Sequence, residues 1–195
     1  MGTTTSHHEQ TFNHLRGQLL VAMPGLTDPG FAHSVVYICE HTPEGAMGLT
    51  INRPLGLPLS QIFAQLNLPC PEKLGALPLL LGGPVQQERG FVLHRSKDQQ
   101  WQSTVSVSDQ ISLTASRDII EAIAHEKGPA ESLIILGYAG WGAGQLEQEL
   151  LANAWLTVPA DAEFLFDTPL ERCAHLAAAR IGINLNQLSN SAGHA

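Results

Sequence analysis

A glycine-rich segment is the first part of the sequence whose residues suit binding chemistry. The segment GYAGWGAGQLEQE, residues 137–149, follows an apolar run and leads into a helical pattern. Dinucleotide sites are built from a strand, a glycine turn and the first turn of a helix. Asp161 lies roughly 20 residues further on, where an acidic residue that binds the ribose is expected. The third glycine has the wrong spacing, however, and too little chain follows for a second mononucleotide half. Backbone N–H groups that bind an anion, or a tight turn against a neighbouring backbone, are therefore favoured.

Two further polar clusters show the same pattern of a glycine turn beside an apolar strand. The segment GAMGLTINRPLG, residues 45–56, ends a strand at Asn52 and Arg53. A guanidinium suits a carboxylate or a phosphate, and an asparagine side chain both donates and accepts hydrogen bonds. The alternative, which is slightly favoured, is that Arg53 pairs with an internal carboxylate while Asn52 closes a turn. The segment GGPVQQERGFVLH, residues 82–94, has the same arrangement.

The three clusters define one set of candidate ligand-binding residues and no assigned catalytic residue. If the protein is an enzyme, Glu147 or His94 is the acid/base candidate. The sequence contains no HExxH motif and no Cys/His spacing typical of zinc, so no metal site is expected, and no cofactor is assigned. A GxSxG nucleophile motif is also missing from the sequence. The candidate residues are Asn52, Arg53, Gly82, Gly83, His94, Gly140, Trp141, Gly142, Gly144, Gln145 and Glu147.

The three cysteines are too few and too widely spaced for a disulfide framework. Cys39 and His41 alternate in an expected strand, which places both on the same face and raises the possibility of a Cys–His nucleophile. A buried, inert Cys39 is favoured over that pair. Cys70 lies between two prolines, so it is expected to react with a thiol reagent faster than Cys39 or Cys173.

The composition excludes several classes of partner. The chain has 195 residues, a formal net charge of −8 and only 10 lysines and arginines, which are scattered. Such a chain repels phosphate backbones, so direct DNA binding is not expected. No apolar stretch is long enough to span a membrane and the polar start has no signal-peptide core, so a cytoplasmic protein is expected. A small anionic ligand or a protein partner remains as the expected partner.

Hydrophobic periodicity predicts strands in the first half and alternating strands and helices in the second. Ser116 is expected to cap one helix, and Thr168 and Glu171 to form a capping box at the start of the last. The expected strands are 17–24, 34–40, 46–52, 78–85, 90–95, 132–138 and 154–159, with a hairpin over 103–114, and the expected helices start at residues 59, 117, 145 and 169. This order indicates a single mixed α/β domain (α+β-like) with antiparallel pairs and one or two parallel crossovers.

Four ordered motifs resemble the YqgE/AlgH family of bacterial proteins. They are LLVAMPGLTDPGFAHSVVYICEH, GAMGLTINRPLG, GGPVQQERGFVLH and LGYAGWGAGQLEQELLANAWL. The resemblance covers residues 17–183 and implies one domain whose largely antiparallel, bifurcated sheet forms a pseudo-barrel flanked by about four helices. Residues 1–16 are then expected to be a flexible leader and 184–195 a polar tail. The family has no established activity, and its name suggests an indirect link to the transcription of exopolysaccharide genes.

Two functions remain open: a non-enzymatic regulatory or ligand-binding module, which is favoured, and an enzyme for a small anionic or nucleotide-like substrate. In both, the glycine segment 140–144 is expected beside Asn52 and Arg53 at the rim of one pocket. That expectation requires the strands 46–52 and 132–138 to run parallel, because only then do their polar ends meet at one sheet edge. An antiparallel pairing would place the two segments at opposite ends.

Overall fold

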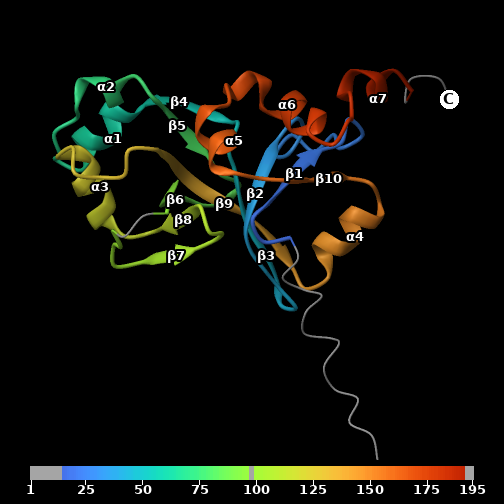
Figure 1. The fold of residues 1–195 in the computed structure, drawn as a ribbon, viewed down its shortest axis with the longest axis horizontal. Coiled ribbons are helices and arrows are strands. Elements are labelled where there is room, and N and C mark those ends of the chain that lie inside the picture. The colour runs from blue at the N-terminus through green and yellow to red at the C-terminus, as the bar shows by residue number, and fades with distance from the viewer. Residues whose placement is uncertain (1–14, 97–98, 192–195) are drawn as a thin grey trace, which may run out of the picture.

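The computed structural model describes residues 15–96 and 99–191 of the chain. Its strands form one curled, mostly antiparallel sheet with two arms, as expected (Figure 1). The first arm runs in the order β10-β1-β2-β3-β9, and all of its pairs are antiparallel. Its strands are β1 (Gln18–Ala22), β2 (Val35–Thr42), β3 (Gly45–Thr50), β9 (Ser132–Gly142) and β10 (Trp155–Pro159).

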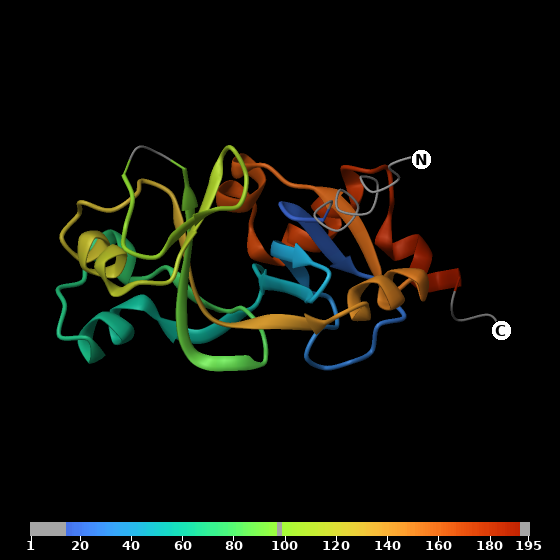
Figure 2. The same cartoon turned by 90° about the horizontal axis from the view of Figure 1, so that it is seen from below.

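The second arm shares β9 with the first. In this arm β9 pairs antiparallel with β6 and parallel with β5. On one side, β4 pairs with β5. On the other side, β8 pairs with β6, and β7 pairs with β8. The additional strands are β4 (Pro54–Pro58), β5 (Pro78–Leu81), β6 (Val85–Arg95), β7 (Thr104–Ser106) and β8 (Ile111–Thr114). In two perpendicular views β9 runs from one half of the molecule into the other (Figure 2). This shared strand is the point at which the sheet forks.

The helices divide between the two arms. Three cover the second arm, α4 follows β9, and the remaining ones cover the first arm after β10 (Figure 1). They are α1 (Leu59–Gln65), α2 (Glu72–Gly75), α3 (Arg117–Ala124), α4 (Gln145–Leu151), α5 (Ala162–Asp167), the 3₁₀ turn η1 (Leu170–Arg172), α6 (Cys173–Ala179) and α7 (Leu185–Ser191). The short helices α2, α5 and α7 were not expected from the sequence, so the molecule has more helices than the four predicted.

Both faces of the first arm are buried, which explains why its strands read as continuous apolar runs. Alternate residues of β1 and β2 enter two different hydrophobic clusters, with Leu19 and Tyr37 in one and Leu20 and Ile38 in the other. The first cluster is completed by α5, α6 and α7, and the second by α4. The C-terminal helices therefore belong to the core, and their packing positions the loops at that end of the sheet.

One local prediction was wrong at the C-terminal end. Thr168 does not cap a helix, because it ends α5 in an extended conformation and Pro169 precedes η1 without a side-chain cap. Asp161 instead caps α5 by accepting a hydrogen bond from the Phe164 amide at 2.8 Å, and it pairs with Arg180. The expected polar tail forms α7 up to residue 191, with Leu185 buried.

At the N-terminal end, most of the expected leader lies outside the described residues. Of residues 1–16, the structure describes Leu15 and Arg16. Leu15 is buried in the cluster under α4, and the Arg16 guanidinium donates to the Ser106 carbonyl. These two residues are therefore packed against the domain.

Candidate functional site

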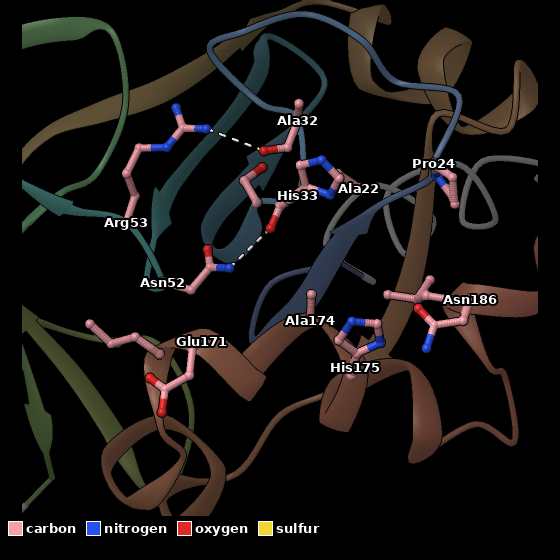
Figure 3. Close-up of a pocket in the computed structure, with 13 residues that line it drawn as sticks. Ala22, Pro24, Ala32, His33, Asn52, Arg53, Glu171, Ala174, His175 and Asn186 are labelled. Atoms are coloured by element: carbon pink, nitrogen blue, oxygen red, sulfur yellow. Dashed lines mark hydrogen bonds between the residues drawn. The ribbon is translucent and has the colours of Figure 1, made fainter. Parts of the chain in front are cut away.

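A cavity of about 460 Å³ opens between the sheet and the C-terminal helices. One wall is the loop between β1 and β2 together with the end of β3, and the other is formed by η1, α6 and α7 (Figure 3). Its polar lining comes from His33, Ser34, Asn52, Arg53, Glu171, His175 and Asn186. We call this the Arg53 cavity. A concave site with a few convergent polar groups is the usual form of a small-molecule pocket.

Asn52 holds the loop of this cavity in place. Its Oδ1 accepts a hydrogen bond from the Val35 amide at 2.9 Å, and its Nδ2 donates to the His33 carbonyl at 3.0 Å. His33 has a positive φ of 62°, a conformation that side-chain-bearing residues adopt rarely and often at functional sites. Asn52 therefore fixes an uncommon backbone turn at the cavity rim, which is close to the turn-closing role predicted as one alternative.

Arg53 does not form the ion pair that the sequence slightly favoured. Its guanidinium donates to the Gly30 carbonyl at 2.5 Å and to the Ala32 carbonyl at 3.3 Å. Within the described residues the ion pairs are four, and Arg53 is in none of them. The backbone carbonyls orient the guanidinium without cancelling its charge. A cation held in this way beside a cavity suits an anionic ligand.

The glycine segment lies at the other end of β3, so the predicted convergence with Arg53 was wrong. β3 and β9 pair antiparallel, with Gly45 opposite Gly142 and Gly48 opposite Ala139. Gly140 and Gly142 are part of β9 itself, and Gly144 takes a left-handed conformation with φ 73° just before α4. None of these glycines lines the Arg53 cavity.

Two glycines of the third cluster allow close approach of backbones. A Cβ on Gly83 would lie 2.2 Å from the Tyr138 carbonyl, and one on Gly82 would lie 2.3 Å from the Gly137 oxygen. Contacts under 3.0 Å are not tolerated, so both positions require glycine at the fork of the sheet. This observation favours the tight-turn alternative for Gly82 and Gly83.

Trp141, Gln145 and Glu149 fasten α4 to the sheet. Gln145 Oε1 accepts from the Gly142 amide at 3.0 Å, so its side chain occupies an N–H group that an anion would need. Glu149 Oε2 accepts from the indoles of Trp141 and Trp155 at 2.9 and 2.8 Å. Both indole rings are buried, so a single carboxylate satisfies two buried donors.

Glu147 and His41 form a second contact between α4 and the sheet. His41 Nε2 lies 2.7 Å from Glu147 Oε1, and His41 is 1% exposed. Cys39 is buried, as favoured from the sequence, and it does not share a face with His41, because β2 has a bulge between Ile38 and Glu40. The bulge shifts the alternation by one residue, so Cys39 enters the cluster under α5–α7 while His41 faces α4.

His94 lies in a buried polar chain of the second arm, away from the lining of the Arg53 cavity. Its Nε2 is 2.8 Å from Thr114 Oγ1, which is 2.8 Å from Thr104 Oγ1. The Trp101 ring packs edge-on against the imidazole. Burial lowers the pKa of His94 below its usual 6.5 and favours the neutral ring.

The cysteines differ in burial as the sequence predicted. Cys39 and Cys173 are buried, and burial raises the pKa of Cys39 and raises that of Cys173 to about 12. Cys70 is half-buried and lines a separate cavity of about 360 Å³ near the start of α2. The order of thiol reactivity stays a prediction that this burial supports.

The described part of the chain adds two further facts. It contains no group of three or more His, Cys, Asp or Glu side chains placed to hold a metal ion. Over the same residues, no helix is both long and apolar enough to cross a membrane.

Sequence reasoning missed half of the Arg53 cavity. Glu171, His175 and Asn186 come from η1, α6 and α7, more than a hundred residues after Arg53. The helical spacing of Leu185 and Leu188, which both pack on the core, was the signal that the tail is a helix. No comparable signal placed that helix opposite Asn52.

Comparisons with known proteins agree on the family. A family model described as AlgH-like matches residues 19–186. A UPF0301 protein of Nitrosococcus oceani is 50% identical over 187 residues, which cover 95% of this chain and all of the relative. A UPF0301 protein of Alcanivorax borkumensis is 53% identical over 184 residues, covering 92% and 96% of the two chains.

Solved structures give the same result. The AlgH protein of Pseudomonas aeruginosa is 48% identical with a TM-score of 0.77, and the match covers 98% of this chain and 100% of that one. The protein DIP2367 of Corynebacterium diphtheriae shares the fold with a TM-score of 0.70 at 20% identity, covering 96% and 94%. The chain therefore belongs to the AlgH-like family of bacterial proteins.

Proposed function

We propose that this protein is a binding module for a small anionic ligand, which it holds in the Arg53 cavity. One observation carries the proposal: Arg53 lines a cavity of about 460 Å³, and its guanidinium is oriented by two backbone carbonyls and is in none of the ion pairs of the described residues. Phosphate and carboxylate groups match the parallel N–H donors of such a guanidinium.

The other polar groups around the cavity complement this role. Asn52 and Asn186 bring amide groups to the lining, and His33 and His175 bring imidazoles that can hydrogen-bond an anion. Glu171 is the one carboxylate among the described lining residues, and it is exposed on the helical wall. An anionic group would therefore bind on the Arg53 side, and Glu171 would accept a hydrogen bond from a donor group of the same ligand.

Binding is better supported than catalysis. The lining contains no cysteine among the described residues, and its hydroxyl, Ser34 Oγ, donates to the Phe31 carbonyl at 2.6 Å and is buried. The two acid/base candidates, Glu147 and His94, have partners elsewhere in the fold.

A regulatory role would act through this ligand or a protein partner rather than through DNA. The net charge of −8 opposes binding to a phosphate backbone, and a single oriented arginine suits a small anion better than a duplex. We place the protein in the cytoplasm on the same sequence grounds, and any link to exopolysaccharide transcription is then indirect.

The test is a titration of the isotope-labelled protein with inorganic phosphate, followed by backbone amide chemical shifts and by calorimetry. We expect saturable shifts at Ala32, His33 and Arg53, and a loss of affinity of at least about tenfold, or ~1.4 kcal/mol, in Arg53→Gln. Arg89→Gln, which changes an exposed arginine of β6, is the matched control and should bind as the parent does.

Arg53 also supports the loop, so a second variant is needed. Asn186→Ala alters the opposite wall and leaves the contacts of Arg53 to Gly30 and Ala32 intact. It should weaken phosphate binding with an unchanged melting temperature. Shifts confined to Gly142 and Gly144, or no saturable shift at all, would contradict the proposal.

A further inference from the structure

A second cavity lies beside the Arg53 cavity, along α6 and α7. This second cavity also measures about 460 Å³ and is lined by Arg172, His175, Leu176, Ala179, Ile183, Asn184, Leu185 and Asn186. His175, Leu185 and Asn186 line both cavities, so the two cavities are neighbours on either side of these residues. Each volume is within the range of about 300–1,000 Å³ that is typical of small-molecule sites.

Each of the two cavities has its own arginine. Arg53 lines the first and Arg172 lines the second, while the exposed imidazole of His175 lies at the boundary. Arg172 is also in none of the four ion pairs of the described residues. Three of the other arginines, Arg95, Arg117 and Arg180, are paired with carboxylates. Among the described residues the two cavity arginines thus have no carboxylate partner in a strongly acidic chain.

The lining of the second cavity favours an anion at one end and an apolar or neutral group beside it. No carboxylate is present among its described lining residues, so nothing there opposes a negative ligand. Leu176, Ala179 and Ile183 give an apolar surface, and Asn184 and Asn186 supply amide donors. Each cavity therefore offers one guanidinium, the imidazole of His175 and the amide of Asn186 are common to both, and Glu171 is the carboxylate of the first.

We infer that the ligand carries two anionic groups separated by a neutral spacer, one bound at Arg53 and the other at Arg172, with the spacer over His175. This inference rests on the proposed function and specifies the class of ligand: a small metabolite with two phosphates or carboxylates on different atoms of one skeleton. A ligand with a single anionic group fills only one of the two cavities.

The experiment compares a hexose bisphosphate with the matching hexose monophosphate by calorimetry on the full chain. The bisphosphate should bind at least about tenfold more tightly, and Arg172→Gln should remove that advantage while leaving monophosphate affinity unchanged. Arg53→Gln should weaken both ligands. Arg89→Gln is the control and should change neither.

The possible failures separate the two proposals. Equal affinity for the two sugars, or no effect of Arg172→Gln with Arg53-dependent binding retained, overturns the inference and leaves the proposed function standing. If neither sugar phosphate shows binding that depends on Arg53, the proposed function is overturned as well. Since Arg172 is exposed, Arg172→Gln is expected to fold, and an unchanged melting temperature verifies this.

Discussion

The two ends of β3 carry polar groups of opposite kinds. At the Gly45 end, Gln145 and Glu149 accept hydrogen bonds from the Gly142 amide and from two buried indoles, so the polar atoms of α4 serve the fold. At the Thr50 end, Arg53 is held by carbonyls that leave its charge uncompensated beside a cavity. Both regions look alike in sequence, as glycine turns with polar neighbours. The difference shows that a binding site is better indicated by a charged group that has no charged partner within the fold than by its sequence pattern.

The largest expected effect tests whether the glycines at the Gly45 end are structural. A Cβ on Gly45 would lie 2.1 Å from the Trp141 oxygen, and Gly45 has a φ of +144°. Gly45→Ala should therefore lose about 4 kcal/mol of unfolding free energy through overlap and backbone strain. Urea unfolding measures this loss.

Gly144→Ala is the matched control at the same end. A Cβ there meets nothing within 4 Å, although its φ of +73° is unfavourable. We expect a loss of about 1 kcal/mol. If the two alanine variants are equally stable, the close-packing explanation for these glycines is wrong.

The next effect concerns Glu149, the acceptor shared by two indoles. Glu149→Ala leaves the N–H groups of Trp141 and Trp155 buried without that carboxylate and should cost about 2–3 kcal/mol. Glu149→Gln keeps one accepting oxygen and should cost less. Both variants should bind phosphate as the parent does, whereas weakened phosphate binding in either would remove the contrast between the two ends of β3.

The smallest effect is a pH dependence from His94, which resembles Glu149 in being satisfied by the protein. Burial lowers its pKa in the folded state, while the unfolded chain keeps the usual 6.5, so the unfolded state binds more protons below that pH. Stability should therefore fall as the pH drops below about 6.5 and stay level with respect to this group above it. Urea midpoints across this range provide the measurement.

His94→Gln is the control for that pH dependence. Glutamine keeps an amide near Thr114 but does not titrate, so the variant should be less stable at neutral pH and show a shallower loss in acid. An unchanged slope would assign the acid sensitivity to another group.

The sequence predicted most strands and the main helices because their apolar patterns are long and regular. The runs at β1, β2 and β9 are continuous because both faces of the sheet are covered there. What these patterns do not encode is the order of strands, so the antiparallel pairing of β3 with β9 could not be read from them. That pairing alone separates Arg53 from the glycine segment.

Local signals were least reliable where glycine and proline were taken as turn residues. Gly140 and Gly142 continue a strand, and the close approach of the two backbones is at Gly45, where a Cβ would lie 2.1 Å from the Trp141 oxygen. One extra residue in β2 moved His41 to the other face, a change that no alternation pattern shows. The wall formed by His175 and Asn186 depends on helices packing across the sheet, which is a tertiary property.

The sharing of β9 between the arms also has a consequence for synthesis on the ribosome. The strands β1, β2 and β3 leave the ribosome first. Their outer partners come later in the chain, because β3 pairs with β9 and β1 pairs with β10. At about 5–20 residues per second, the chain from Thr50 to Ser132 takes seconds to emerge, and both outer edges of this apolar hairpin sheet stay open meanwhile. The nascent N-terminal half is thus a predicted client for chaperones that cover strand edges.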